Sequence, residues 1–118
     1  MVDLETARNL CLSLPSVEEY DHFGKPAYRV KKKIFTTLTL DSKRAVVKLS
    51  KSQQPELCDE YHPAVFPVKN KWGELGWTNV ELDKVSEGAF KRLIELAWTN
   101  VAPKTLIKTR TIFRVNPK

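Results

Sequence analysis

Long apolar runs are absent from this chain of 118 residues, and none approaches the roughly 18 residues that a membrane-spanning helix needs. The N-terminus also lacks a basic segment followed by an apolar one. We therefore expect no signal peptide, no membrane partner and a cytoplasmic location. Cysteine is scarce: Cys11 and Cys58 lack Cys-x-x-Cys spacing and are most simply reduced core residues, although sequence alone leaves a disulfide between them open.

Clusters of chemically reactive residues are scarce too. His22 and His62 have no metal-ligand spacing with each other or with the cysteines. No glycine-rich phosphate loop and no nucleophile motif is present. The best acid–base candidate is His22, which lies beside Asp21 and Lys25, but a solitary histidine is the commoner explanation. The sequence therefore predicts no metal, no cofactor and no catalytic residue, and favours a protein that is not an enzyme.

The composition is that of a folded domain rather than a disordered chain. Apolar residues make up 42% of the sequence, with three Trp, five Phe and three Tyr. The length fits one domain. We place that domain at residues 3–103 and expect a monomer. Residues 104–118 carry five bases and no acid, and form a basic extension that is either an added strand or a flexible tail.

Hydrophobic periodicity predicts an α+β fold with helices packed on one face of an antiparallel sheet. Helices are expected at 4–14, capped by Asp3, at 53–61, capped by Ser52, and from Ser86 to just before Pro103. The predicted strands are 27–31, 34–40, 45–49 and 77–82. Short turns join the first three strands, which predicts an antiparallel meander. Residues 16–21 are expected to be extended, 24–26 to be a turn, and 69–76 to be a loop.

The side-chain alternation of two strands carries specific expectations. In the strand 34–40, Ile34, Thr36, Leu38 and Leu40 should share one face. In the strand 77–82, Thr78, Val80 and Leu82 should share a face, with Trp77 on the opposite side. The apolar stripe of the last helix, from Phe90 to Val101 at i, i+3, i+4 spacing, is expected to be core.

Positive charge is concentrated in residues 25–51, where nine of 27 residues are Lys or Arg and one is acidic. The stretch carries +8, whereas the whole chain carries +6. Its alternation predicts strands with a basic solvent-facing side, which suits a polyanionic partner. The alternative, which involves no binding partner, is a solvated sheet whose edges are protected from aggregation by lysines. Lysine outnumbers arginine seven to two, which favours phosphate contacts over base readout.

Tryptophan adds a second candidate feature. Trp72 and Trp77 lie in a segment with Lys69, Lys71 and two glycines. A tryptophan beside lysines can stack on an unpaired base. We favour the alternative, a tryptophan packed beneath a loop. The predicted nucleic-acid-binding residues are Arg29, Lys31, Lys32, Lys33, Lys43, Arg44, Lys48, Lys69, Lys71 and Trp77.

A resemblance to a known family covers about residues 3–103. It rests on HFGKPAYRV at residues 22–30 and KIFTTL at 33–38, preceded by LSLPSVEE at 12–19 and followed by VKL at 47–49. These segments resemble the MmcQ/YjbR family. The resemblance implies a CyaY-like (frataxin-like) α+β domain, whose members are proposed to bind DNA through paired hairpin wings. The matching positions, none with an implied catalytic role, are Phe23, Pro26, Lys33, Phe35, Lys48 and Trp77.

Two departures and one analogy qualify what the resemblance implies. Trp98 stands where the family commonly has tyrosine, and the basic extension is longer than expected. The frataxin-like kind raises iron by analogy, but the first helix offers only Asp3 and Glu5, so we expect none.

Two functions from different classes are compatible with the sequence. The first is a non-enzymatic domain that binds nucleic acid, most simply DNA, through its phosphate backbone. The second is an interaction module for a small acidic ligand or a protein, with its site near His22, Phe23, Lys48 and Trp77. The second requires that Trp77 be accessible and that a cleft adjoin Lys48.

Overall fold

The computed structural model describes residues 1–107, in which one antiparallel sheet has the strand order β1-β2-β3-β4-β6-β5. In chain order its strands are β1 (Glu18–His22), β2 (Lys25–Val30), β3 (Lys33–Thr39), β4 (Arg44–Lys48), β5 (Val65–Pro67) and β6 (Trp77–Glu81). The helical elements are α1 (Leu4–Leu12), α2 (Gln53–Glu60), α3 (Lys71–Glu74), the 3₁₀ turn η1 (Leu82–Lys84) and α4 (Glu87–Val101). The predicted α+β class is confirmed.

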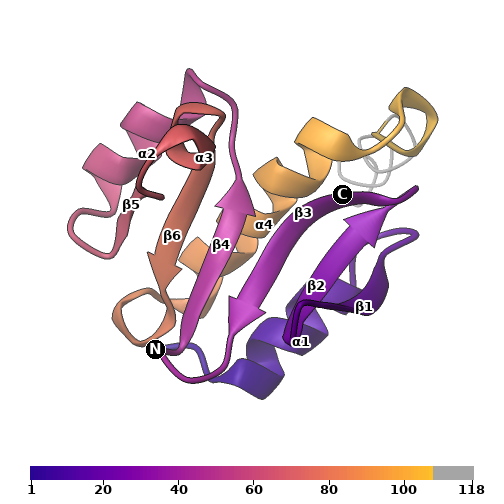
Figure 1. Cartoon of the computed structure of the whole chain (residues 1–118), viewed down its shortest axis with the longest axis horizontal. Coiled ribbons are helices and arrows are strands. Elements are labelled where there is room, and N and C mark those ends of the chain that lie inside the picture. The colour runs from indigo at the N-terminus through magenta and orange to yellow at the C-terminus, as the bar shows by residue number, and fades with distance from the viewer. Residues whose placement is uncertain (108–118) are drawn as a thin grey trace, which may run out of the picture.

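The core lies between the sheet and the helices that cover one of its faces. In Figure 1, α4 crosses behind β3 and β4, and α1 lies behind the lower end of the sheet. The predicted stripe of α4 is buried from Phe90 to Trp98. Thr78 and Val80 are also fully buried, so the predicted inward face of β6 is confirmed. The opposite face of the sheet carries no long helix in the described part of the chain, which leaves it available for a site.

Helix starts follow from side-chain caps. Asp3 accepts a 2.7 Å hydrogen bond from the Thr6 amide, and Ser86 accepts one of 3.0 Å from Ala89. Ser52 occupies the predicted N-cap position of α2, but its side chain makes no capping hydrogen bond. Ser50 Oγ accepts from the Gln53 amide at 3.1 Å, while Gln53 Oε1 accepts from the Ser50 amide at 2.9 Å. This reciprocal capping box satisfies two amides, which a lone serine would not do.

Two hairpins close through left-handed residues. Phe23 and Gly24 join β1 to β2 with φ of 53° and 83°, and Lys31 and Lys32 join β2 to β3 with φ of 51° and 69°. Positive φ at both central residues is the geometry that matches strand twist in two-residue turns. The predicted turn at 24–26 is therefore displaced, because Lys25 already belongs to β2. The expected extended piece is a full partner strand, β1, which lengthens the meander to four strands.

A β-bulge in β3 changes the predicted side-chain alternation. Arg29 pairs with Ile34 and Tyr28 pairs with Thr36, so Phe35 is the extra residue. Phe35 is fully buried, whereas Ile34 is only partly buried. Of the four residues predicted to share one face, Thr36 and Leu38 are both buried, but the bulge separates Ile34 from them, and Leu40 lies beyond β3 and is half exposed.

The basic extension is described only at its start. Residues 104–107 form a helical turn in which the Leu106 and Ile107 amides donate to the Pro103 carbonyl at 3.0 and 3.1 Å. These four residues are therefore not part of a strand. The rest of the predicted strand or tail, residues 108–118, lies outside the described residues.

A polar cluster ties α1 to the β1–β2 hairpin. Arg8 donates to both carboxylate oxygens of Glu19, at 2.8 and 3.1 Å. The buried Tyr28 donates its hydroxyl to Glu19 Oε2 at 2.7 Å. Hydrogen bonds from Arg8, and then from Tyr28, lower the pKa of Glu19 from its ordinary value. Burial, followed by the bond to Glu19, raises the pKa of Tyr28.

This cluster predicts an acid-sensitive contribution to stability. Because the pKa of Glu19 is lower in the folded state, its carboxylate stabilises the fold above the unfolded pKa of about 4.3 and loses that effect as the pH falls through the folded pKa. We expect Glu19→Gln to be less stable than wild type in urea unfolding at neutral pH, with a difference that shrinks on acidification below about pH 4. Glu56→Gln on α2 controls for loss of a surface carboxylate. A constant difference at all pH values would contradict the argument.

Candidate functional site

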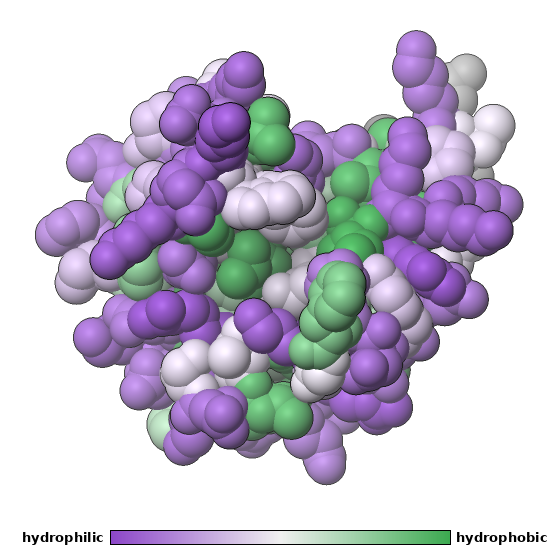
Figure 2. All heavy atoms as spheres, viewed as in Figure 1, coloured by the Kyte–Doolittle hydropathy of each residue, from purple (hydrophilic) through white to green (hydrophobic). Residues whose placement is uncertain are grey.

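A groove crosses the open face of the sheet, between the β1–β2 hairpin and α3. Its volume is about 340 Å³, and the sheet forms its floor. Figure 2 shows the hollow with hydrophobic side chains inside it and hydrophilic ones on both sides. Its lining residues are His22, Lys25, Ile34, Thr37, Val46, Val68, Trp72 and Trp77. Apart from His22, Lys25 and the Thr37 hydroxyl, this lining is apolar or aromatic, as is usual for ligand sites.

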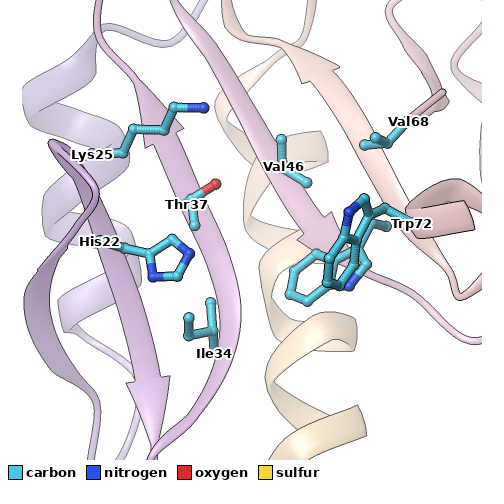
Figure 3. A pocket seen from close by; sticks show the side chains of 8 residues that line it. His22, Lys25, Ile34, Thr37, Val46, Val68 and Trp72 are labelled. Carbon is cyan, nitrogen blue, oxygen red and sulfur yellow. The ribbon is translucent and has the colours of Figure 1, made fainter. Parts of the chain in front are cut away.

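The β1–β2 hairpin forms one wall. His22 and Lys25 are directly opposite each other in the register, on either side of the turn. In Figure 3 both side chains reach over the floor that Ile34 and Thr37 form. His22 Nδ1 lies 3.2 Å from Tyr20 Oη, which orients the imidazole ring.

An exposed aromatic residue lies at the tip of the same hairpin. The ring of Phe23 meets the His22 ring edge-on, with centroids 4.7 Å apart, yet Phe23 is 92% exposed. A phenylalanine so exposed at the rim of a groove is an unusual surface feature. The turn geometry accounts for it, because left-handed φ at Phe23 directs its side chain out from the sheet end.

Tryptophans form the opposite wall. Trp72 on α3 is 59% exposed, and Trp77 at the start of β6 is partly exposed and lines the groove. Our preferred interpretation, a tryptophan packed beneath a loop, is therefore wrong for Trp72, whereas Trp77 is partly buried. The Lys48 ammonium lies 5.3 Å from the centre of the Trp77 ring and donates to the Leu75 carbonyl at 2.8 Å. Lys48 therefore positions this wall, and the predicted placement of Trp77 opposite the buried face is confirmed.

Gln54 of α2 holds the tryptophan segment in place, although no motif or spacing in the sequence singles it out. Its Nε2 atom lies 3.0 Å from the Gly73 carbonyl, 3.2 Å from the Trp77 carbonyl and 3.0 Å from Thr78 Oγ1. The expected loop 69–76 is in fact built around α3, with the Asn70 side chain accepting from the Trp72 amide at 3.1 Å. Asn70, a residue type that favours the N-cap position, was the local signal for this short helix.

Both arginines of the predicted basic surface form ion pairs with carboxylates on neighbouring strands. Arg29 Nε lies 2.7 Å from Glu18 Oε1, and its guanidinium lies 4.0 Å from the centre of the Tyr20 ring. Arg44 lies 3.7 Å from Glu81 and over the Phe66 ring. Each pair comes from directly opposite positions of neighbouring strands. Both arginines are therefore paired within the sheet, which makes them less available to a binding partner.

The exposed lysines fall into separate groups. Lys31, Lys32 and Lys33 lie at the β2–β3 turn, and Lys33 directly precedes Ile34 of the groove floor. Lys69 and Lys71 flank the opposite wall. Lys43 lies at the β3–β4 turn, at the other end of β3 and roughly 20 Å away along a seven-residue strand. Of the predicted lysines, Lys33, Lys69 and Lys71 are direct chain neighbours of the lining residues Ile34, Val68 and Trp72; Lys31 and Lys32 precede Lys33, and Lys43 lies at the opposite end of β3 from them.

Other chemistry has little support in the described part of the chain. No group of three His, Cys, Asp or Glu residues there is arranged to hold a metal ion. Cys11 and Cys58 are free thiols, and burial raises the pKa of each. Every helix among residues 1–107 is too short or too polar to cross a membrane.

Comparisons with known proteins agree with this architecture. The family model described as YjbR matches residues 12–100, which include both walls of the groove. The crystal structure of Deinococcus radiodurans protein DR2400, which carries the domain DUF419, is similar with a TM-score of 0.72 and 19% sequence identity, over 83% of this chain and 77% of that one. At that identity the likeness concerns the fold alone. No curated protein matches the chain.

Proposed function

This chain belongs to the YjbR family, and from the lysines on both sides of its groove we propose that it is a non-enzymatic nucleic-acid-binding domain that holds the phosphate backbone of DNA. One observation carries the proposal. Exposed lysines lie at both ends of β2 on one side, Lys25 in the groove lining and Lys31 to Lys33 at the β2–β3 turn, and Lys69 and Lys71 lie on the other side. A backbone that follows the groove would pass between two rows of positive charge.

The kind of cation supports backbone contact rather than base-edge readout. Arg29 and Arg44, the two arginines of the meander, are already paired with Glu18 and Glu81. The remaining charges are lysine ammonium groups, which act as point charges and lack the planar fork that reads guanine. Binding should therefore be only weakly dependent on DNA sequence.

A salt titration tests this function. If about five phosphates are neutralised on a labelled duplex, the logarithm of the binding constant should fall against the logarithm of salt concentration with a slope near −4.5. The variant Lys31→Asn/Lys32→Gly should weaken binding to all duplexes alike and reduce the slope by about two. It also installs the dipeptide that this left-handed turn prefers, so the fold is preserved.

The matched control removes two lysines away from the groove. Lys43→Asn/Lys91→Gln changes the net charge equally, at the β3–β4 turn and on α4 behind the sheet, and should leave the slope nearly unchanged. Absent binding at low salt, or binding that is insensitive to salt, would reject the proposed function. An equal effect of both double variants would show that only overall charge matters.

A second candidate function has its own support in the groove. Trp77 is accessible and the cleft adjoins the wall that Lys48 positions, which are the two conditions for a small acidic ligand. His22 and Lys25 would then face the ligand's acidic group. This function predicts saturable binding of a small aromatic acid with a change in tryptophan fluorescence, and no dependence on oligonucleotide length.

A further inference from the structure

We propose that the groove takes one unpaired base of a single strand, stacked against Trp72, while the lysines on either side hold the adjoining phosphates. This inference rests on the proposed function and narrows its substrate from DNA in general to single-stranded DNA. The carrying observation is an aromatic wall that is accessible and set between cationic rims.

The aromatic surfaces are positioned for stacking rather than for the core. Trp72 is 59% exposed, although α3 that bears it is fixed by the Asn70 cap and by Gln54. Figure 3 shows Trp72 on one side of the groove and His22 on the other, with the floor between them. A base has two apolar faces, and stacking on an aromatic side chain needs a flat partner that is already ordered.

The size and polarity of the groove suit a base better than a duplex. Its volume of about 340 Å³ is near the lower end of the roughly 300–1,000 Å³ typical of ligand sites. In a duplex, both faces of every base are covered by its neighbours, so no base face reaches such a hollow without unstacking. Besides Lys25, the polar groups of the lining are the Thr37 hydroxyl and the His22 imidazole, which can meet the edge of a base.

Positive charge around the groove suits the phosphates of a single strand. Lys25 lines it directly, and Lys71 is the chain neighbour of Trp72. A strand that inserts one base would therefore place a phosphate near an ammonium group on each side of that base. Glu74 is also exposed on α3. Its carboxylate repels phosphate, so the nucleic-acid backbone is disfavoured on that side of the helix.

The test compares a labelled oligothymidylate of about 12 nucleotides with a duplex of the same length, at one salt concentration. Wild type should bind the single strand more tightly, with quenching of tryptophan fluorescence. Trp72→Leu should lower the ratio of single-strand to duplex affinity about tenfold, because a base stacked on an aromatic ring contributes that much. Trp72→Phe keeps a flat ring and should restore most of the ratio. Because Trp72 is exposed, both variants should keep the wild-type circular dichroism spectrum.

The outcomes separate this inference from the proposed function. Equal or tighter binding of the duplex, with no effect of Trp72→Leu on the ratio, overturns the base-stacking inference and leaves phosphate-backbone binding standing. Failure to bind either form overturns both. Thymidine monophosphate that binds as tightly as the oligonucleotide also overturns the inference, since the groove would then be a small-ligand site.

Discussion

Replacing Gly76 by alanine is expected to lower the free energy of unfolding by about 3 kcal/mol or more, because two separate costs meet at this residue. Its φ of 107° lies in a region that residues with a Cβ rarely adopt. A Cβ built there would also lie 1.9 Å from the Leu49 carbonyl oxygen, which is backbone and cannot rotate away. This close approach allows a backbone hydrogen bond, in which the Leu49 amide donates to the Gly76 carbonyl at 3.0 Å, where the chain enters β6.

Two other glycines separate the two costs in urea unfolding of the purified variants. Gly24 has a φ of 83° but open space around its Cβ position, so Gly24→Ala should show backbone strain alone, about 1 kcal/mol. A Cβ on Gly73 would lie 1.8 Å from the Val68 carbonyl oxygen, with no positive φ, so Gly73→Ala should show the steric cost alone. We expect Gly76→Ala to exceed both. A Gly76→Ala variant no less stable than Gly24→Ala would contradict the packing argument.

The same substitution should disturb the groove before the core. Gly73 directly follows Trp72 and Gly76 directly precedes Trp77, and Gln54 bonds to the carbonyls of Gly73 and Trp77. A shift at Gly76 therefore displaces the tryptophan wall relative to the hairpin wall. We expect the Gly76→Ala protein that remains folded to lose its preference for single strands in the binding comparison described above.

Periodic elements were predictable from the sequence because their signal is local. The α4 stripe, the Asp3 and Ser86 caps and the inward face of β6 depend only on spacing along the chain, and the structure confirms them. The strand β1 was missed as a strand because Glu18, Tyr20 and the other residues of this edge are largely polar and show no apolar alternation. An edge strand that faces solvent needs little apolar surface to pair.

Features that depend on partners across the sheet were not predictable. The bulge at Phe35 arises from register with β2, and a one-residue slip reverses the faces of a strand. The pairing of Arg29 with Glu18 likewise requires the unpredicted strand β1. The positions of the lysines and arginines can be read from the sequence. The groove is assembled from five separate stretches of chain, and no local sequence pattern predicts such a site.

The Trp98→Ala variant should lose about 3–5 kcal/mol of folding free energy, the range for removing a large aromatic residue from a core. Trp98 is fully buried in α4, and its indole Nε1 donates to the Pro15 carbonyl at 3.0 Å. That bond ties the helix to the chain between α1 and β1, so the cavity would open where three elements meet.

A graded series separates packing from hydrogen bonding at this position. Trp98→Phe keeps a ring but leaves the Pro15 carbonyl without its indole donor, so it should fall between wild type and Trp98→Ala. Trp72→Ala removes the same side chain from an exposed site and should change stability by only about 0.5 kcal/mol. Equal losses for Trp72→Ala and Trp98→Ala in urea unfolding would mean that Trp72 is packed in solution, which would remove the accessible ring on which the base-stacking proposal depends.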